Sequence, residues 1–484
     1  MPRIWKTALL IFSSVLVSTP NRAAADRVEA VRVPSTEYTS IEYGDAAPLT
    51  RPRRNTATSP ALTTIELAPL AQAASVGTEE PKAGEPLRVG SHRSVPTQWS
   101  GLIPPTDLPW EAAANGGQLA TLAIRSPGAR AIRAELLFES LPEGAEVRFY
   151  APTSPETAHG PFDGTHLVRR RDLVSRLRAD ERTTWSPLIG GDEMVIEVFV
   201  PVESGTDEVW FGIETVAHID RLPYDPRPEK ALGDSGSCNR NLACESKWKK
   251  VGKSVALIFF EVAGFGSVVC TGQLLNDTDP DTDKPYLLTA RHCISKKKEA
   301  RSATFLWFYR RAKCQGGPIV DASTQTTGGA KILYKSKKPG SKKSTDLSLL
   351  KLKRNPPSGV TYSGWTSEDA TDIVDRLVRG IHHPSGDAKK VSKGDVLVTS
   401  HFDFGLLGPP FSHYVVQWRK GTTEGGSSGS GLWIGKKFPD QYLVGVLTGG
   451  SAGCFFRDGL DFYGILSEDF ARSKKLRKFL DPPN

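Results

Sequence analysis

Hydrophobic and polar residues alternate in short runs through most of the chain after residue 86. Between residues 86 and 220, Pro and Gly separate these runs, for example at 118–124, 146–150 and 194–200. Period-two alternation bounded by turn residues predicts short β-strands. The regular spacing of the strands suits an antiparallel β-sandwich, which we place at residues 86–225.

The same pattern returns from Ser237 onward. Apolar runs at 254–260, 303–309 and 441–447 are again separated by turn residues. About 240 residues of short strands fit a pair of closed β-barrels better than a parallel sheet. The last run, 467–480, instead predicts a helix, because acidic residues open it, basic residues close it and Pro482 follows. The predicted fold class is therefore all-β.

Two stretches lack this alternation. Residues 26–85 are rich in Ala, Thr, Ser and Pro, and we expect them to form a poorly ordered leader. Residues 222–229 are polar and rich in proline, which predicts a linker. A second folded unit then occupies residues 231–484. Two domains also agree with the length of 484 residues, which exceeds one ordinary core.

The first 25 residues have the pattern of an export signal. Arg3 and Lys6 precede an apolar run at 7–18, and three alanines before Asp26 offer a cleavage site. An N-terminal membrane anchor is the alternative, but the run is short for a bilayer. We expect a secreted protein, extracellular or periplasmic in transit, with no membrane association once the signal is removed.

Cysteine and positive charge are concentrated in the second half. All six cysteines lie between Cys238 and Cys454, and in an exported protein they predict disulfides, with fifteen possible pairings. No Cys-x-x-Cys pair supports a metal site, and we expect neither metal nor cofactor. An acidic run at 277–283 lacks the Gly and Glu spacing of an EF-hand, so we interpret it as a solvated loop.

The charge distribution separates the two halves as well. Lys plus Arg minus Asp plus Glu is +14 for residues 231–484 and −6 for residues 1–230, which together give the net +8. A basic half could bind polyanions, but no motif that reads nucleic acid accompanies it. We expect a soluble basic surface, partly complementary to the acidic N-terminal half, and no nucleic-acid partner.

Three short segments carry the residue types of acyl-transfer chemistry. His292 and Asp346 each lie at the end of a strand-like run, and Ser428 lies in a glycine-rich turn between two such runs. A serine needs an imidazole to take its proton, and the imidazole needs a carboxylate to fix its tautomer. Gly426 and Gly429 permit a sharp turn, which aims the N–H groups of Gly426 and Ser428 at one point, an oxyanion hole. The turn alone could also be a flexible linker.

From about Ser235 the chain resembles the trypsin-like (chymotrypsin-fold) serine proteases, and among them the bacterial lysyl endopeptidase group. The resemblance rests on the segments around His292, Asp346 and Ser428, and on further matches at 235–239, 381–384 and 416–418. It implies a trypsin-like double β-barrel with a C-terminal helix, preceded by a pro-region. It also implies a serine endopeptidase that works through a His-Asp-Ser triad and an acyl-enzyme. The implied disulfides are Cys238–Cys454, Cys244–Cys314 and Cys270–Cys293.

The resemblance extends to substrate specificity. In this group an Asp floors the pocket for the residue before the scissile bond; Asp461 matches it, with Asp458 as the alternative. A buried carboxylate selects Lys or Arg. Trp418 matches a Trp beside the family pocket, whereas Thr448 stands where the group has a His. We therefore favour Lys and leave Arg open. The backbone of Thr448, Gly449 and Gly450 could pair with an extended substrate.

Activation is expected to differ from that of many trypsin-like enzymes, in which an Asp before the catalytic Ser pairs with the new N-terminal amine. Ser427 occupies that place without a charge. Latency is then expected from the N-terminal region, which resembles the pro-regions of the group and makes the chain a zymogen. We predict self-cleavage between Lys230 and Ala231. The expected partners of this monomer are its own pro-region and protein or peptide substrates with a basic residue before the scissile bond. The alternative function is a catalytically silent basic protein on the same fold that binds polyanions or cell surfaces.

Overall fold

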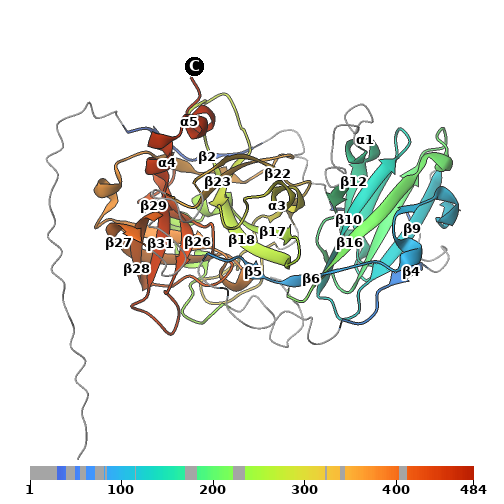
Figure 1. Cartoon of the computed structure of the whole chain (residues 1–484), viewed down its shortest axis with the longest axis horizontal. Helices are drawn as coiled ribbons and strands as arrows, with labels where there is room; N and C mark the ends of the chain where they lie inside the picture. The colour runs from blue at the N-terminus through green and yellow to red at the C-terminus, as the bar shows by residue number, and fades with distance from the viewer. Residues whose placement is uncertain are drawn as a thin grey trace, which may run out of the picture.

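The computed structural model describes residues 30–39, 49–54, 62–70, 81, 84–114, 116–168, 183–221, 235–321, 324–337, 344–402 and 411–483. Strands dominate these residues and form two units, an N-terminal sandwich and a C-terminal pair of barrels (Figure 1). The predicted export signal, the linker and the predicted processing bond between Lys230 and Ala231 lie outside the described residues.

The N-terminal unit consists of two facing sheets. One has the strands β13 (Thr183–Trp185), β10 (Ala131–Ser140), β16 (Trp210–Ile219) and β6 (Gly90–Arg93), with β14 (Ile189–Gly190) and β7 (Leu102–Ile103) at its sides. The other has β3 (Leu49–Thr50), β12 (Ala158–Asp163), β11 (Glu146–Tyr150), β15 (Glu193–Val200), β9 (Gln118–Arg125) and β4 (Thr63–Glu66), with β8 (Trp110–Ala112) beside β9. Apolar side chains of both sheets share one core, as the alternation predicts.

The C-terminal unit also has two sheets. The first barrel contains β21 (Gln325–Thr326), β20 (Thr304–Leu306), β17 (Val255–Val262), β18 (Gly266–Leu275), β19 (Tyr286–Ala290), β23 (Leu347–Leu352) and β22 (Ala330–Lys335), with helix α3 (Lys297–Ser302) before β20. The second barrel contains β30 (Gln441–Gly450), β29 (Gly431–Gly435), β26 (Leu377–His382), β27 (Lys390–Phe402), β28 (Phe411–Lys420) and β31 (Leu460–Ile465). Because β31 pairs back with β30, these six strands close.

The sandwich and the double barrel confirm the predicted fold class. The C-terminal helix differs in detail, because the run predicted as one helix forms α4 (Leu466–Arg472) and α5 (Lys474–Leu480). Ser473 interrupts it, since its side chain accepts the Leu476 N–H and caps α5. Phe470 of α4 packs on Trp365, with ring centroids 4.9 Å apart.

Parts of the predicted leader form strands instead of being poorly ordered. β1 (Arg32–Val33) pairs with β25 (Gly364–Thr366), and β2 (Thr36–Glu37) pairs with β24 (Thr361–Tyr362). A Cβ on Gly364 would lie 2.3 Å from the Val33 carbonyl oxygen, so glycine permits this approach. β3 and β4 likewise join the sandwich. The expectation fails for these residues because unpaired edge strands of distant domains accept them, which composition cannot reveal.

The two units are packed against each other, with the sandwich on the first barrel (Figure 1). The chain runs from β5 (Leu87–Arg88), which pairs with β18, directly into β6 of the sandwich. Arg133 of β10 is fully buried and donates to the Ser302 carbonyl at 2.9 Å and to Thr304 Oγ1 at 3.1 Å. It also lies 3.4 Å from Glu261 of β17. The most deeply buried charge pair of the interface thus has its cation on the sandwich, the reverse of the complementarity expected from net charge.

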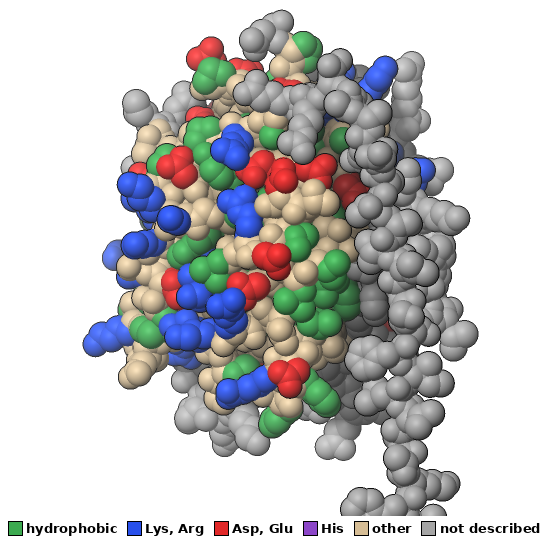
Figure 2. All heavy atoms as spheres, turned by 90° about the vertical axis from the view of Figure 1, so that its left-hand side faces the viewer, with side chains coloured by type: hydrophobic (Ala, Val, Ile, Leu, Met, Phe, Trp, Pro, Cys, Tyr) green, Lys and Arg blue, Asp and Glu red, His purple; other side chains and the backbone are tan. Residues whose placement is uncertain are grey.

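The outer surface of the second barrel carries both signs of charge. Figure 2 shows Lys and Arg side chains gathered toward one edge of this face, with Asp and Glu side chains among and beside them. This face therefore presents no uninterrupted basic surface. Within the part of the chain that the structure describes, no helix has the length and apolar character to cross a membrane.

Candidate active site

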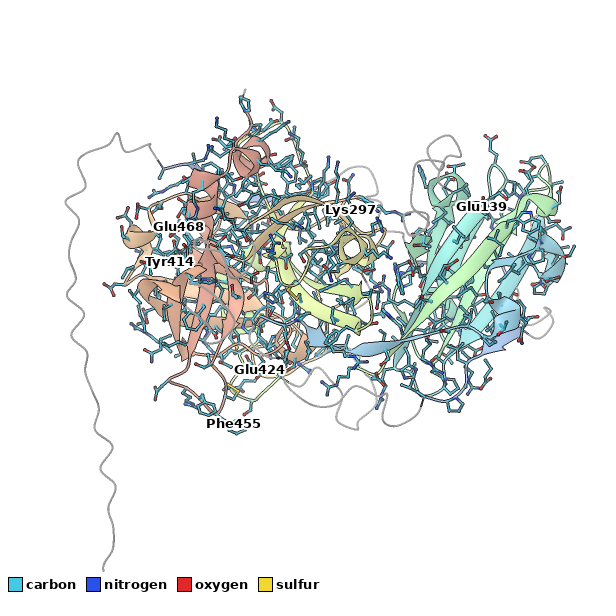
Figure 3. All side chains as sticks on the ribbon, in the orientation of Figure 1. Glu139, Lys297, Tyr414, Glu424, Phe455 and Glu468 are labelled. Atoms are coloured by element: carbon cyan, nitrogen blue, oxygen red, sulfur yellow. A yellow bond between two sulfur atoms is a disulfide. The ribbon has the colours of Figure 1, made fainter. Side chains whose placement is uncertain are left out.

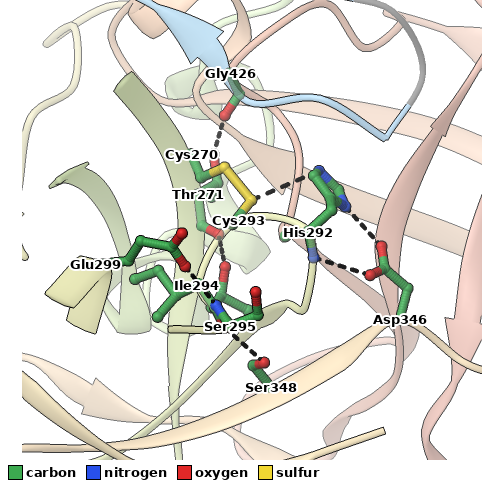
Figure 4. The surroundings of a disulfide bond; sticks show 12 residues. Cys270, Thr271, His292, Cys293, Ile294, Ser295, Glu299, Asp346, Ser348 and Gly426 are labelled. Carbon is green, nitrogen blue, oxygen red and sulfur yellow. Dashed lines mark hydrogen bonds and ion pairs between the residues drawn. A yellow bond between two sulfur atoms is a disulfide. The ribbon is translucent and has the colours of Figure 1, made fainter. Parts of the chain in front are cut away.

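His292 and Asp346 form a buried pair between β19 and β23. The His292 Nδ1 atom lies 2.6 Å from Asp346 Oδ2, and the His292 backbone N–H donates to Asp346 Oδ1 at 3.0 Å (Figure 4). Asp346 has a φ of 54° and is 1% exposed, and its carbonyl accepts the Arg291 N–H at 2.8 Å. The carboxylate thus fixes the imidazole ring and favours a proton on Nδ1, which leaves Nε2 as the acceptor.

Ser428 lies in the tight turn after β28, which is held against β18. The Thr271 N–H donates to the Ser428 carbonyl at 2.8 Å, and Thr271 Oγ1 donates to the Gly426 carbonyl at 2.9 Å. Gly426 and Gly429 have φ values of 86° and 84°. A Cβ on Gly429 would lie 2.2 Å from Thr289 Oγ1, so both backbone conformation and space require glycine there.

The structure brings the three predicted segments together but leaves one contact unmade. His292 Nε2 lies 3.7 Å from Cys293 Sγ, and in the described residues no hydrogen bond joins His292 to Ser428. Cys293 is bonded to Cys270, the residue before Thr271. The disulfide therefore ties the segment that carries His292 to the strand that holds the Ser428 turn. Catalytic hydrogen bonds often tighten only when substrate is bound.

The backbone N–H groups of the turn have two kinds of surroundings. The Ser427 N–H donates to the Glu424 carbonyl at 3.0 Å, and the Gly429 N–H donates to the Leu447 carbonyl at 2.9 Å. Across the described ranges, no acceptor is assigned to the N–H groups of Gly426 and Ser428. These are the two groups that the sequence predicts for an oxyanion hole, and both are available for an external acceptor.

Asp461 of β31 is enclosed in the second barrel. Its Oδ2 atom accepts from Trp418 Nε1 at 2.5 Å and from Thr423 Oγ1 at 2.7 Å. Its Oδ1 atom accepts no hydrogen bond from a described side chain, although the Ala452 N–H lies near the carboxylate, and a Cβ on Gly450 would lie 2.4 Å from Oδ1. Burial raises the pKa of Asp461 to about 6, although hydrogen bonds from Trp418, Thr423 and the Ala452 backbone oppose the shift. One oxygen of this buried carboxylate thus has no side-chain partner among the described residues.

Asp458, the alternative floor residue, is exposed and lines a different hollow. This cavity of about 790 Å³ also has Asp395 and Arg419 in its wall. Trp418 separates the two places, since it lines the cavity and donates to Asp461. Beside the cavity, the loop after Cys454 exposes Phe455 to the extent of 98%, and the side chain points away from the barrel (Figure 3).

Sequence reasoning missed several side chains of the site. Thr423 binds Asp461, and His413 of β28 binds Thr448, with its Nε2 atom 2.8 Å from Thr448 Oγ1. A histidine therefore lies beside position 448 after all, but it comes from another strand. Pairing across the barrel brings these residues together, so spacing along the chain gives no signal for them.

The uncharged Ser427 has a histidine and a carboxylate near it. Ser427 Oγ is 2.8 Å from His382 Nδ1. Glu424 Oε1 accepts the Gly236 N–H at 2.9 Å and Asn239 Nδ2 at 2.6 Å, so it binds the start of the described C-terminal unit (Figure 3). The carboxylate that binds the segment around Gly236 and Asn239 is thus Glu424, four residues before Ser428 in the chain. Sequence reasoning considered only position 427, directly before the nucleophile, and therefore missed it.

The structure contains the disulfides Cys238–Cys454, Cys244–Cys314 and Cys270–Cys293, the same pairs that the resemblance implies. The first links the segment bound by Glu424 to the loop that precedes Asp461.

Comparisons with known proteins agree with this arrangement. A family model of the lysyl endopeptidase N-terminal domain matches residues 59–220, and one of the lysyl endopeptidase C-terminal domain matches residues 232–464. The chain belongs to the lysyl endopeptidase family. The lysyl endopeptidase of Pseudomonas aeruginosa is 31% identical over 417 residues, which cover 81% of this chain and 83% of that protein. Family membership makes the protein a serine endopeptidase. The N-terminal match begins before residue 86, in line with the place of β4 in the sandwich.

Solved structures of other proteases show weaker likeness. The HtrA-type protease AlgW with a tripeptide has a TM-score of 0.31 and 16% identity, covering 49% of this chain and 62% of its own. The active form of the Rv3671c protease from M. tuberculosis has a TM-score of 0.33 and 14% identity, covering 54% of this chain and 95% of its own.

Proposed function

We propose that this member of the lysyl endopeptidase family is exported as a zymogen and, once processed, cleaves peptide bonds after Lys. Ser428 is the nucleophile, His292 the general base and Asp346 the carboxylate that orients it. The observation that carries the proposal is the buried His292–Asp346 pair beside the glycine turn of Ser428. The N–H groups of Gly426 and Ser428 form the oxyanion hole.

The proposed reaction has two stages. Ser428 Oγ attacks the scissile carbonyl carbon while its proton moves to His292 Nε2, and Asp346 stabilises the imidazolium. The tetrahedral oxyanion accepts from the Gly426 and Ser428 N–H groups. The intermediate collapses as His292 protonates the leaving amine, and an acyl-enzyme remains. Water, deprotonated by His292, then attacks the ester carbonyl and releases the acid and free Ser428.

The carboxylate of Asp461 supports a cationic side chain before the scissile bond. Because Trp418 and Thr423 occupy Oδ2, Oδ1 is the oxygen without a side-chain partner among the described residues. A guanidinium is suited to both oxygens of a carboxylate at once, whereas an ammonium is a compact charge that one oxygen can bind. This asymmetry favours Lys over Arg. The strand backbone at Thr448, Gly449 and Gly450 then supports the substrate chain by pairing.

Labelling of the nucleophile tests the proposal directly. Processed protein treated with a sulfonyl fluoride should gain one adduct, located on Ser428 by peptide mass spectrometry. Absence of an adduct, together with absence of peptide-bond cleavage, would instead favour the catalytically silent binding protein.

A digest of a denatured protein of known sequence tests the specificity. We expect new C-termini at Lys in large excess over Arg. Equal cleavage after Lys and Arg would contradict the preference for Lys while leaving the serine mechanism intact.

The zymogen part of the proposal has its own test. Self-cleavage between Lys230 and Ala231 requires that Ser428→Ala protein, expressed alone and secreted, keeps its pro-region. The surface variant Asp440→Asn serves as the control that can still process. A Ser428→Ala chain that matures to Ala231 unaided would show that another protease does the cutting.

A further inference from the structure

The segment around β5 belongs to the N-terminal half of the chain but pairs with β18 of the first barrel rather than with the sandwich. In β5, Leu87 and Arg88 pair antiparallel with Val269 and Val268 of β18, and the Val89 N–H donates to the Ser267 carbonyl at 2.8 Å. Leu87 is 4% exposed. It packs in a cluster with apolar side chains from both units, among them Val269, Leu257, Phe259 and Ala388. The segment is thus bound both as an added strand and through a buried side chain.

This segment lies against the Ser428 turn. A Cβ on Gly426 would lie 3.5 Å from Leu87 Cδ2, and the ribbon of the segment passes beside Gly426 in Figure 4. Val269 directly precedes Cys270, whose disulfide leads to His292. In the intact chain Ser428 is 7% exposed and the His292 side chain 8% exposed. Little of either side chain is therefore accessible to solvent in the intact chain.

The direction of the segment matches that of a substrate. Because the pairing is antiparallel, residues ahead of Leu87 run along β18 toward Thr271, which binds the Ser428 carbonyl. Residues after Leu87 lead away from Ser428. Asp461, which binds the acyl-side residue in the proposed function, lies in the other barrel. A substrate whose acyl-side residue binds Asp461 must therefore run from Ser428 onto β18 with the residues after its scissile bond. Its chain direction along β18 is then the same as that of β5.

The sequence of the segment explains why Ser428 would not cleave it. The described residues directly ahead of Leu87 are Gly84, Glu85 and Pro86, and none of these three is a Lys or Arg that could enter the Asp461 pocket. Pro86 also carries a ring on the backbone nitrogen and no N–H. The segment can therefore bind along β18 without offering a favourable bond to Ser428.

We propose that residues 84–90 occupy the leaving-group side of the substrate cleft in the uncleaved chain and block it there. The binding surface is the edge of β18 beside Gly426, and its ligand is an extended peptide with an apolar side chain at the place of Leu87. This inference rests on the proposed function, since it takes Ser428 as the nucleophile and Asp461 as the acyl-side pocket.

The test uses a preparation that contains both intact and processed chain. The mixture reacts with a fluorescent diphenyl phosphonate analogue of lysine. Gel electrophoresis then separates the intact and processed chains into two bands, and the amount of label per chain is measured in each band. We expect the processed band to react at least about tenfold faster. Leu87→Asp should raise the rate of the intact band at least about tenfold, because a carboxylate is costly in an apolar pocket.

Matched variants separate blocking from general damage. Leu87→Met should keep the intact band slow. Arg88→Ala should do so too, because it removes guanidinium contacts with the Gly90 carbonyl, Ser91 Oγ and the Phe265 ring but leaves the Leu87 side chain and the backbone pairing with β18 in place. Equal labelling of intact and processed parent bands would overturn the inference while supporting the proposed function. No label on either band would contradict the proposed function itself. A Leu87→Asp intact band that stays as slow as the parent would also overturn the inference.

A second measurement holds even where Leu87→Asp fails to fold. A synthetic peptide of residues 84–93 should slow labelling of the processed chain and do so competitively with substrate. The same peptide with Leu87→Asp should be at least about tenfold weaker. A parent peptide without effect at millimolar concentration, or two peptides of equal potency, would count against the proposed occupant.

Discussion

Two buried aspartates of the site have different surroundings, and the difference assigns them different tasks. Asp346 accepts from the His292 side chain and backbone with its two oxygens, so it is matched to a partner within the chain. Asp461 accepts from Trp418 and Thr423 with one oxygen, and its other oxygen has no side-chain partner among the described residues. In the proposed function, the same side chain thus serves orientation in one place and recognition of a cation in the other.

The raised pKa of Asp461 predicts a pH dependence of binding. Its carboxyl has a pKa of about 6 in the empty protein, and only the ionised form attracts a cation. Butylamine, an analogue of the Lys side chain, should bind the processed protein with constant affinity above that pH and about tenfold more weakly per pH unit below it. Titration calorimetry measures this. In Asp461→Asn protein binding should be weak and independent of pH. A parent affinity that does not change between pH 7 and pH 4 would exclude Asp461 as the ligand.

The Asp346 carboxylate predicts a loss in the chemical step. Asp346→Asn should lower kcat by about 10⁴-fold with a small change in KM, because the amide no longer holds the acceptor tautomer of His292. Steady-state kinetics with a lysyl ester measure both constants, and the surface variant Asp440→Asn serves as the control. A loss confined to KM would mean that Asp346 acts in binding instead.

At the scale of elements, the catalytic turn is positioned from three sides. β18 holds it through Thr271, His382 of β26 binds Ser427, and Glu424 links it to the start of the C-terminal unit. Position 427 carries no charge, yet the turn is fixed by neutral hydrogen bonds and by the Glu424 carboxylate, four residues before Ser428. Rigidity of the turn thus does not need an ion pair at the position before the nucleophile.

Glu424→Gln should loosen this link. The amide can accept one bond, but it cannot reproduce both charge-assisted bonds to Gly236 and Asn239, and the cost should be about 1–3 kcal/mol of stability. Thermal unfolding measures it, and kcat should fall while KM changes little. Glu468→Gln, which removes a helical surface pair with Arg472, should cost at most about 0.5 kcal/mol. Equal effects of the two variants would show that Glu424 has no special role.

The Cys270–Cys293 disulfide should stabilise the link between β18 and His292. Replacing both cysteines by Ala should lower the free energy of unfolding by about 3 kcal/mol, as expected for the loop that a separation of 23 residues closes. Denaturant unfolding provides the value. An unchanged midpoint, with a free thiol count that proves the bond is absent, would contradict the estimate.

At the scale of the whole molecule, the sandwich and the double barrel share a sealed interface. Besides Arg133, the Gln325 side chain donates to the Leu188 carbonyl at 3.0 Å and accepts the Leu188 N–H at 3.1 Å. Glu261 also accepts from Ser267 Oγ at 2.6 Å and lies 2.9 Å from His92 Nε2. The contacts of Arg133, His92 and Leu188 with the first barrel join residues that are far apart in the chain, so cleavage of the linker alone does not remove them.

Arg133→Ala should weaken the association of the two units. It leaves Glu261 and the Ser302 carbonyl buried without their cationic partner, at a cost of about 3–5 kcal/mol. After processing, the sandwich should separate from the double barrel during size-exclusion chromatography more readily than in the parent. Arg125→Ala, which removes a side chain that is 45% exposed on the sandwich, should leave the association unchanged. Separation at the same rate in both variants would mean that Arg133 does not hold the interface.

The sequence determined those features that depend on short stretches of chain. Alternation of apolar residues predicted the strands, and local motifs pointed to His292, Asp346, Ser428 and the glycines of the turn. Each of these signals lies within a few neighbouring residues, because strand period and turn conformation are local properties.

Tertiary structure alone decided the features that depend on distant partners. Strand pairing brought Thr423 to Asp461, Glu424 to Gly236, and Leu87 to β18 beside Gly426. Free sheet edges, rather than composition, gave residues 32–37 their strands, and one serine side chain divided the C-terminal helix in two. Such contacts depend on edges, cavities and unpaired groups that exist only when the barrels have formed, so no local pattern in the chain encodes them.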